Sequence, residues 1–274
     1  MSPVLAAAGV GLLAGVHTAT WGMYKDAPHE GFGWPRYARS IVVSTLAAPL
    51  VAWLADLDPR VPAGFVVLFA VTYAFERALV EFYKTFLREE DQSKYTIPMQ
   101  FHVMGQVVKQ RGKRALIGAA HIVAVLLFAL LALAVERLLS FLPAWLRLGL
   151  VGSVGGWLSA FGGAWKDAPI EGFHTFKFFR SPLMAMSYAM LLSLFTHNVI
   201  LVGFGALGLT IATIETYKTF FFPSRPRGKF QGKPISHPQY LTFRQRFVPM
   251  YAGIWLVLIA QVALALSGRL TSAT

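Results

Sequence analysis

Long apolar runs are the feature of this sequence that most constrains its fold. Eight runs of mostly hydrophobic residues alternate with polar segments along the chain. About 20 helical residues cross the hydrocarbon core of a bilayer, so the shorter runs need residues from their flanks to span it. The runs are Val4 to Trp21, Ile41 to Leu54, Val61 to Val80, Ala115 to Val135, Leu148 to Trp165, Leu183 to Phe195, Val199 to Ile214 and Tyr251 to Leu266.

These runs predict an all-α polytopic membrane protein of about eight transmembrane helices. Inside lipid every backbone N–H and C=O group must be paired within the structure, and a helix pairs them within one segment. A closed barrel would require alternating apolar and polar residues, which the runs lack. Charged residues make up 14 % of the chain, about half of what a soluble domain carries. The absence of cysteine excludes a disulfide framework and thiolate chemistry.

The net charge of +12 is unevenly distributed. If the helices alternate in direction, the loops at 24–40, 84–114, 166–181 and 218–246 lie on one side and hold 20 of the 25 Lys and Arg residues. The positive-inside rule then places these loops in the cytoplasm and both termini outside, which suits a bacterial inner membrane. The expected partners are membrane lipids with anionic head groups and not nucleic acid. A homo-oligomer or a partner membrane subunit is left open.

A charged octapeptide occurs twice, as KDAPHEGF from Lys25 and as KDAPIEGF from Lys166. Positions 22–40 match positions 163–181 at ten of 19 places, at a constant offset of 141. A second pair of similar segments, EFYKTF at 81–86 and ETYKTF at 215–220, follows at an offset of 134. The sequence therefore predicts two parallel four-helix repeats, at 1–135 and 148–274, related by a pseudo-two-fold axis along the membrane normal. We expect the segment 136–147 to be an interfacial linker between them.

Glycine pairs precede both octapeptides. Gly11 and Gly15 in the first half correspond to Gly152 and Gly156 in the second half. Small residues four apart allow two membrane helices to approach closely. We expect these positions to pack the first helix against the fifth.

The repeated charges are the candidate binding site. All of them are expected at the cytoplasmic boundary, where ionisable groups near hydrocarbon are costly and point to function. Arginine forks onto phosphate or carboxylate, and lysine acts as a point charge. The candidate substrate-binding residues are Lys25, Asp26, Glu30, Arg39, Glu81, Lys84, Lys166, Asp167, Glu171, Arg180, Glu215 and Lys218.

Three functional interpretations follow from this set. The first is a transporter-like or lipid-handling protein for an anionic, phosphate-bearing substrate, with no cofactor. The second is a membrane-embedded enzyme acting on a lipid or polyprenol phosphate, in which the carboxylates hold Mg²⁺. The third is a non-catalytic structural subunit, in which the charges form a salt-bridge network that braces the helices. Because both copies keep their charges, a role used symmetrically is favoured, and whether the protein is an enzyme is left open.

A short resemblance supports the enzyme interpretation. The strings KDAPIEGF and RPRGKFQGKP resemble the Lys-x-x-Glu-Gly-Phe and Gly-Lys stretches of the CDP-diacylglycerol synthase and polyprenol kinase group. The resemblance covers only a few residues. The spacing from Lys166 to Glu171 is longer by two than in that group, and no Asp-rich metal signature follows. It implies a diphosphate-handling enzyme with Mg²⁺ as its cofactor.

Overall fold

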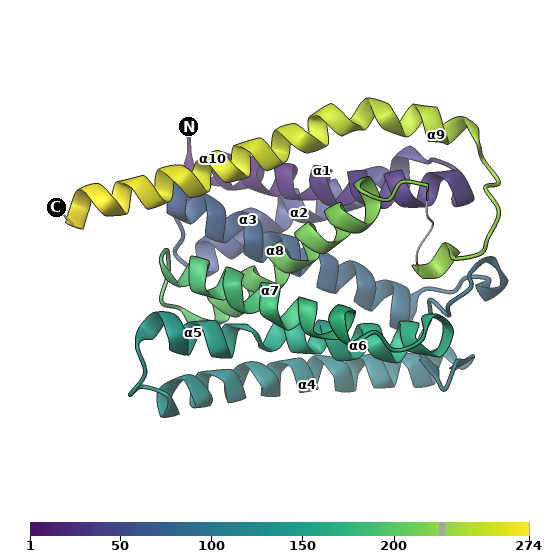
Figure 1. Ribbon diagram of the computed structural model, residues 1–274, viewed down its shortest axis with the longest axis horizontal. Coiled ribbons are helices and arrows are strands. Elements are labelled where there is room, and N and C mark those ends of the chain that lie inside the picture. Colours follow the sequence, from purple (N-terminus) through teal and green to yellow (C-terminus); the bar gives the residue numbers. More distant parts are fainter. Residues whose placement is uncertain (225–227, 274) are drawn as a thin grey trace.

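The protein is mostly helical, and helices account for 78 % of the chain. The computed structural model describes the backbone of residues 1–224 and 228–273, and the side chains at 166, 167, 169–171, 225–228 and 269–274 lie outside that description. Figure 1 shows the elements in the colours of the sequence. The long helices are α1 (Pro3–Glu30), α2 (Trp34–Leu54), α3 (Pro62–Phe82), α4 (Arg111–Leu138), α6 (Val154–Glu171), α7 (Thr175–Ser193), α8 (Val199–Phe220) and α10 (Val248–Ala273).

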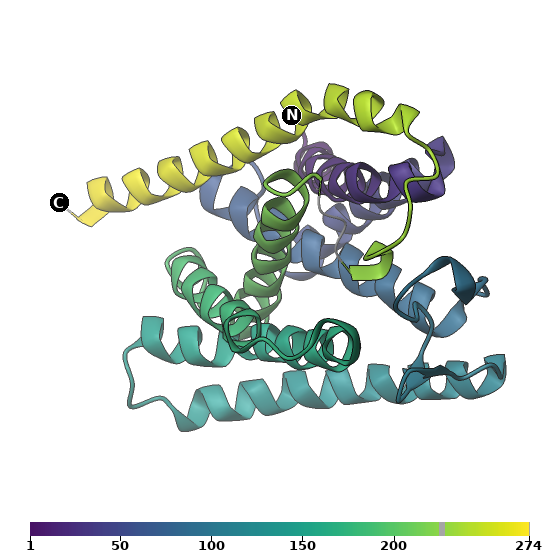
Figure 2. The same ribbon diagram turned by 45° about the vertical axis from the view of Figure 1, so that its right-hand side comes forward.

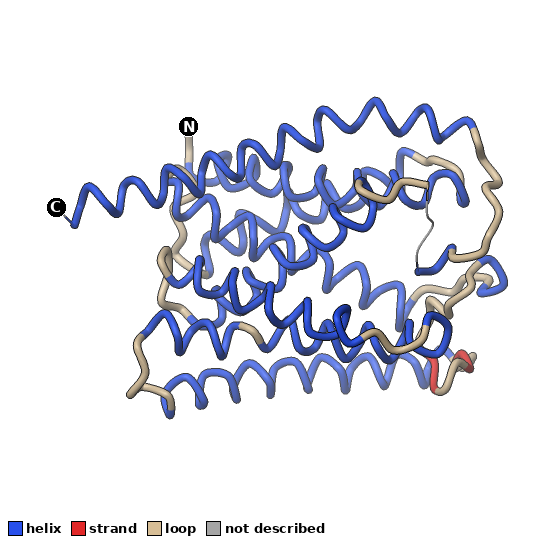
Figure 3. The backbone as a smooth tube through the Cα atoms, in the orientation of Figure 1, coloured by secondary structure: helices blue, strands red, loops and turns tan. Residues whose placement is uncertain are grey.

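Short elements lie between the long helices. They are the π-helical turn η1 (Tyr83–Leu87), the 3-10 turns η2 (Gln92–Lys94), η3 (Gly228–Phe230) and η4 (Arg244–Phe247), the helices α5 (Ala144–Gly152) and α9 (Gln239–Phe243), and the strands β1 (His102–Val103) and β2 (Gln106–Val107). The two strands pair antiparallel as a small hairpin. Figure 3 shows that the loops gather at the two ends of the helix bundle.

Six segments of the described chain are long and apolar enough to cross a membrane, which is consistent with an integral membrane protein. They are Pro3–Glu30, Trp34–Leu54, Pro62–Leu87, Arg111–Leu138, Val199–Phe220 and Gln239–Gly268. The predicted run from Leu148 to Trp165 is divided at Ser153 into α5 and α6. The tract Gly-Ser-Val-Gly-Gly at this point has low helix propensity, and the Ser153 hydroxyl donates to the Leu150 carbonyl.

Helices α3 and α8 cross at the centre of the molecule. Gly208 of α8 lies against the backbone of Ala70 and Ala74, so a side chain at this position would collide with α3. The largest apolar core surrounds this crossing and draws residues from both halves of the chain. Helices α4 and α10 lie on opposite outer sides (Figures 1 and 2).

The glycine pairs pack inside hairpins, so the expected contact between the first and fifth helices is wrong. Gly11 and Gly15 lie against α2, and Gly152 and Gly156 lie against α7. The spacing of small residues predicts a close approach but does not name the partner helix. The partner helix lies in the same half of the chain in each case.

The contacts of the two glycine pairs with α2 and α7 are similar. An ideal Cβ atom on each of the four glycines would meet at least one residue that corresponds to a residue met in the other half, at the same offset of 141 residues. The matched contacts are Gly11 with Ala48 and Gly152 with Ala189, and Gly15 with Ser40 and Gly156 with Ser181.

The octapeptide ends its helix with the same turn in both halves. Gly31 has φ 76° and ψ 164°, and Gly172 has φ 77° and ψ 165°. The N–H of each glycine donates to the alanine carbonyl four residues earlier, Ala27 or Ala168. A positive φ favours glycine, so the repeated Glu-Gly is a helix stop.

Helix α1 continues through Pro28 to Glu30, although a proline disfavours helix at the residue before it. Proline lacks the N–H that would bond the carbonyl of Tyr24. The guanidinium of Arg244 supplies this donor instead, with Nη1 at 2.8 Å from the Tyr24 oxygen. A contact from the far end of the chain therefore completes the last turn of α1.

The segment 136–147, expected as a linker, contains the end of α4, a turn and the start of α5. Arg147 and Glu136 form an ion pair across this turn, with Nε and Oε1 2.7 Å apart. The turn joins the two helices directly. Its position at a membrane interface stays a prediction.

Candidate functional site

A cavity of about 1220 Å³ lies between the two halves of the chain. Its described lining comes from α1, α2, α3, η1 and the loop after it, α4, α6, α7 and α8, and from the segment that leads into α10. It reaches from the loops after both octapeptides to the middle of the α3–α8 crossing, at Ala74 and Leu207. It is larger than the range of about 300–1,000 Å³ that is common for small-molecule sites.

The cavity gathers nine of the twelve predicted site residues. These are Lys25, Asp26, Glu30, Arg39, Glu81, Lys84, Arg180, Glu215 and Lys218. The side chains of Lys166, Asp167 and Glu171 lie outside the described residues, so their positions stay predictions.

The described lining is strongly basic. It contains eleven Lys and Arg residues against four Asp and Glu residues. Six of the basic residues were not among the predicted site residues, namely Arg36, Arg77, Arg88, Lys177, Lys229 and Arg244. Such a surface attracts anions.

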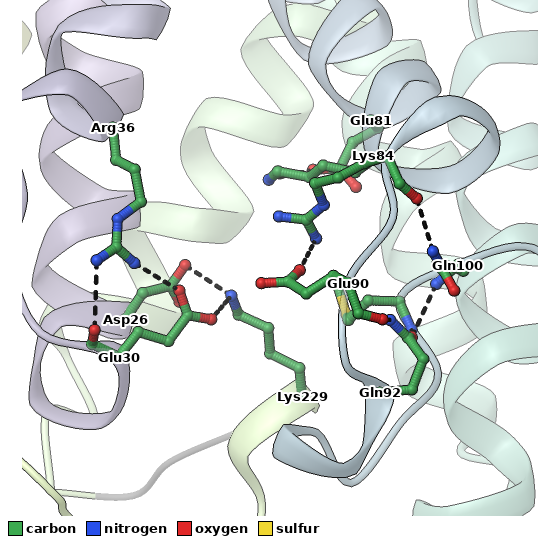
Figure 4. Close-up of polar contacts among 11 residues, drawn as sticks. Asp26, Glu30, Arg36, Glu81, Lys84, Glu90, Gln92, Gln100 and Lys229 are labelled. Carbon is green, nitrogen blue, oxygen red and sulfur yellow. Dashed lines mark hydrogen bonds and ion pairs between the residues drawn. The ribbon is translucent and has the colours of Figure 1, made fainter.

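Lys229 holds the two acidic residues of the first octapeptide. Its Nζ lies 2.9 Å from Asp26 Oδ2 and 2.9 Å from Glu30 Oε1 (Figure 4). Burial by itself would lower the pKa of Lys229, but the charges of Asp26 and Glu30 outweigh it and the pKa is raised. Arg36 also reaches Glu30, with Nη1 3.3 Å from Oε2.

The sequence contained one signal for Lys229. The segment Ser93-Lys94-Tyr95 resembles Gly228-Lys229-Phe230, and the two segments form the 3-10 turns η2 and η3. Their aromatic rings, Tyr95 and Phe230, lie 5.9 Å apart. The resemblance shows that the loops correspond, but it does not show which carboxylates Lys229 binds.

A second ion pair joins the two halves. Lys25 Nζ lies 3.5 Å from Glu215 Oε2, and Lys218 Nζ lies 3.8 Å from Glu215 Oε1. Lys25 also lies over the ring of Trp21, 4.8 Å from its centroid. Lys25, which was predicted to gather with the charges of its own half, thus pairs with Glu215 of the other half.

Helix α3 carries a third group of charges. Glu81 Oε1 accepts from Arg77 Nη2 and from Lys84 Nζ, the latter at 3.2 Å. Residues three and four apart share a helix face, which brings the three side chains together. All three line the cavity.

Arg39 and Arg180 line the cavity from α2 and α7, at corresponding positions of the repeat. The Nε of Arg39 is buried without a hydrogen-bond partner among the described residues. An unpaired buried donor is costly, so an acceptor at this position is favoured. Among the predicted basic residues, Arg39 is therefore well suited to receive an oxyanion.

Some of the lining is apolar. Ala74, Leu207 and Ile211 line the cavity from positions on α3 and α8 that lie farther from the octapeptide side than the charged lining residues of the same helices. A cavity with basic and apolar lining matches the chemistry of an anionic amphiphile.

All four carboxylates of the described lining already have a lysine or arginine partner. The described residues contain no group of three His, Cys, Asp or Glu side chains in a metal-binding arrangement. A Mg²⁺ ion would have to displace these basic partners before it could bind the carboxylates.

The chain matches no known protein-family model, no curated protein and no solved structure. The interpretation of the site therefore depends on its residues and their geometry.

Proposed function

We propose that the protein is a transporter-like, lipid-handling membrane protein that binds an anionic, phosphate-bearing amphiphile in the cavity between its halves. The carrying observation is the cavity itself, whose lining combines eleven Lys and Arg residues with apolar residues from the middle of α3 and α8. Arginine and lysine bind the phosphate, and the apolar lining accommodates part of the hydrocarbon. Each carboxylate of the described lining is paired with a lysine or arginine. In this proposal the carboxylates balance part of the positive charge of the site.

The proposal includes eight spans arranged as two parallel four-helix units. The repeated glycine contacts and the repeated octapeptide turns support this arrangement. The α3–α8 crossing supports it too, since Ala74 and Gly208 touch and correspond at the repeat offset of 134. A two-fold axis through this contact would run into the cavity. The basic loops then face the cytoplasm of a bacterial inner membrane.

Native mass spectrometry of the protein in nanodiscs tests the proposal. The nanodiscs contain phosphatidylcholine with a small fraction of phosphatidylglycerol, whose phosphate is the probe. We expect wild type to retain phosphatidylglycerol and Arg39→Gln to bind it about tenfold more weakly, because a charge-assisted hydrogen bond contributes about 1.5–3 kcal/mol. Arg39 has no described ion-pair partner, so its replacement leaves the internal salt bridges intact.

Lys113→Gln is the matched control. Lys113 is an exposed basic residue outside the described cavity lining, and it reports lipid attracted to the basic surface. Equal retention by wild type and Arg39→Gln would contradict the proposed site. A loss of thermal stability in Arg39→Gln without a change in lipid binding would favour the structural interpretation.

A further inference from the structure

The cavity takes matching charged residues from both halves of the chain. In its described lining, residues that correspond in the sequence repeat occur in pairs. They are Arg39 and Arg180 at the offset of 141, and Glu81 and Glu215 with Lys84 and Lys218 at the offset of 134. The cavity therefore receives the same kinds of anion-binding group twice.

The two arginines enter the cavity from different hairpins. Each is the sixth residue of its helix, Arg39 in α2 and Arg180 in α7. Helix α2 packs against α1 and α3, whereas α7 packs against α6 and α8. Figures 1 and 2 show the two hairpins on opposite sides of α8. The two guanidinium groups are thus held by separate parts of the fold.

The lysines of the two halves also have matching partners. Lys84 Nζ lies 3.2 Å from Glu81 Oε1, and Lys218 Nζ lies 3.8 Å from Glu215 Oε1, each within one turn of helix. Each lysine follows its glutamate by three residues, so both pairs share a helix face. The local arrangement of charge is therefore similar at the ends of α3 and α8.

One phosphate group makes limited use of this lining. A charge-assisted hydrogen bond is about 2.7–2.9 Å long, so a single phosphate binds both arginines only if the two side chains converge on one point. The cavity volume of about 1220 Å³ is much larger than a phosphate group. Two phosphate groups can instead be bound separately, one by each half.

The charge of the lining also favours a ligand with more than one negative charge. Eleven Lys and Arg residues face four Asp and Glu residues in the described lining. A phosphodiester carries a single negative charge, which balances little of this excess. Basic pockets between transmembrane helices are typical binding sites for the head groups of lipids with several phosphates.

We propose that the ligand is an amphiphile with two separate phosphate groups. One phosphate is bound by Arg39 and Lys84, and the other by Arg180 and Lys218. Two phosphates joined through glycerol, as in cardiolipin, have this chemistry. A diphosphate does not, because its two phosphorus atoms share an oxygen and remain together. Only the head group and the adjacent part of the chains enter the cavity. This inference rests on the proposed function and specifies the class of lipid.

Native mass spectrometry tests the inference with two lipids at equal phosphate content. The full chain is placed in phosphatidylcholine nanodiscs that contain either cardiolipin or phosphatidylglycerol. We expect one cardiolipin per chain, bound at least about tenfold more tightly than phosphatidylglycerol, because the first bound phosphate holds the second at a high effective concentration. Phosphatidylglycerol should bind as two molecules. Farnesyl diphosphate is the third probe, and tighter binding of it than of cardiolipin would overturn the two separate positions.

Arg39→Gln and Arg180→Gln test the two positions one at a time. Each substitution should lower the affinity for cardiolipin to about that for phosphatidylglycerol, and should leave one tightly bound phosphatidylglycerol in place of two. The tenfold weakening expected above for Arg39→Gln then applies to the phosphatidylglycerol of the first half. Lys113→Gln is again the control and should keep the preference for cardiolipin.

Lys84→Gln and Lys218→Gln form a second pair of variants, which keeps the test valid if an arginine variant fails to fold. Each leaves the neighbouring glutamate with another basic partner, Arg77 for Glu81 and Lys25 for Glu215. We expect both substitutions to weaken cardiolipin binding by similar factors. An effect in one half only would overturn the proposal, because the second phosphate would then have no matching position.

The outcomes separate this inference from the proposed function. Absence of binding for both lipids would overturn the proposed function. Binding of a single phosphatidylglycerol, with no preference for cardiolipin, would support the proposed function and overturn the two-phosphate inference.

Discussion

Phe32 closes the first octapeptide and Phe173 closes the second, and the two rings have different surroundings. Phe32 packs among Tyr37, Tyr240 and Phe247, whereas Phe173 is 60 % exposed. The backbone turn beside each ring is the same. The repeated sequence thus determines the turn, and the rest of the chain determines what covers it.

The covering segment runs from Lys229 to Phe247 and contacts the first octapeptide. Lys229 binds Asp26 and Glu30, the His237 N–H donates to Pro28 O at 2.9 Å, and Arg244 bonds Tyr24. The comparable loop of the first half contains the β1–β2 hairpin. The rings of Phe32 and Phe173 therefore follow the same backbone turn but have different surroundings. Four substitution experiments examine this difference.

The largest effect is expected where the two hairpins are built alike. An added Cβ at Gly15 would lie 2.6 Å from Ile41 Cα, and one at Gly156 would lie 2.6 Å from Ser181 O. We expect Gly15→Ala and Gly156→Ala each to lower the free energy of unfolding by about 3 kcal/mol, because backbone must move apart. Thermal unfolding in detergent measures this. Gly9→Ala and Gly162→Ala are controls with open space around the added carbon. Tolerance at only one of the two sites would contradict equivalent packing.

Arg244→Ala should produce the next largest effect. It removes the donors to Tyr24 O and Pro223 O and leaves a buried carbonyl in α1 unpaired. We expect a loss of about 2 kcal/mol and faster hydrogen exchange in the last turn of α1. Exchange in α6 should not change. The control is Arg246→Ala, because Arg246 is exposed two residues away. Equal effects of the two substitutions would argue against the proposed role in completing α1.

Phe32→Ala and Phe173→Ala measure directly how much each of the two rings contributes to stability. The half-buried Phe32 ring should contribute about 1.5 kcal/mol, less than the 3–5 kcal/mol of a fully buried phenylalanine. The exposed Phe173 should contribute less than about 0.5 kcal/mol. Chemical denaturation of both variants gives the two values. Similar losses would mean that the second octapeptide is covered in the membrane by a surface comparable to the first.

The smallest effect is expected from the ion pairs of Lys229 at alkaline pH. Its pKa is raised in the folded protein, so its stabilising contribution is complete below the unfolded value of about 10.4 and is lost as pH rises through the folded value. We expect wild type to lose up to about 1 kcal/mol in this range relative to Lys229→Arg. Arginine keeps its charge, so parallel pH profiles for the two proteins would exclude this contribution.

The sequence predicted the local features of the site better than it predicted which charged residues pair with each other. The Glu-Gly step of each octapeptide is a local feature that favours a turn, and both glycines have a positive φ. The clustering of charges was also predictable, since the loops that carry them lie at one end of the helices. The partner of each charge was not predictable. Helical periodicity places a side chain on a face, but it does not say that Lys25 meets Glu215 of the other half.

Two departures had physical causes outside the local pattern. The continuation of α1 past Pro28 depends on a donor from Arg244, which no local propensity can indicate. The division of α5 from α6 has a local signal in the glycines around Ser153, but the apolar run conceals it. The two similar octapeptides share a backbone turn, whereas residues of the segment before α10 determine what the first octapeptide pairs with.

The bond between Arg244 and Tyr24 also affects the order in which the protein is completed during synthesis. Helix α1 is synthesised well before Arg244, because the donor for its proline-interrupted turn lies 220 residues later in the chain. Every nascent chain that ends before Arg244 therefore lacks this donor. The last turn of α1 gains its final hydrogen bond only after the start of α10 is being made, so a segment synthesised early is completed late.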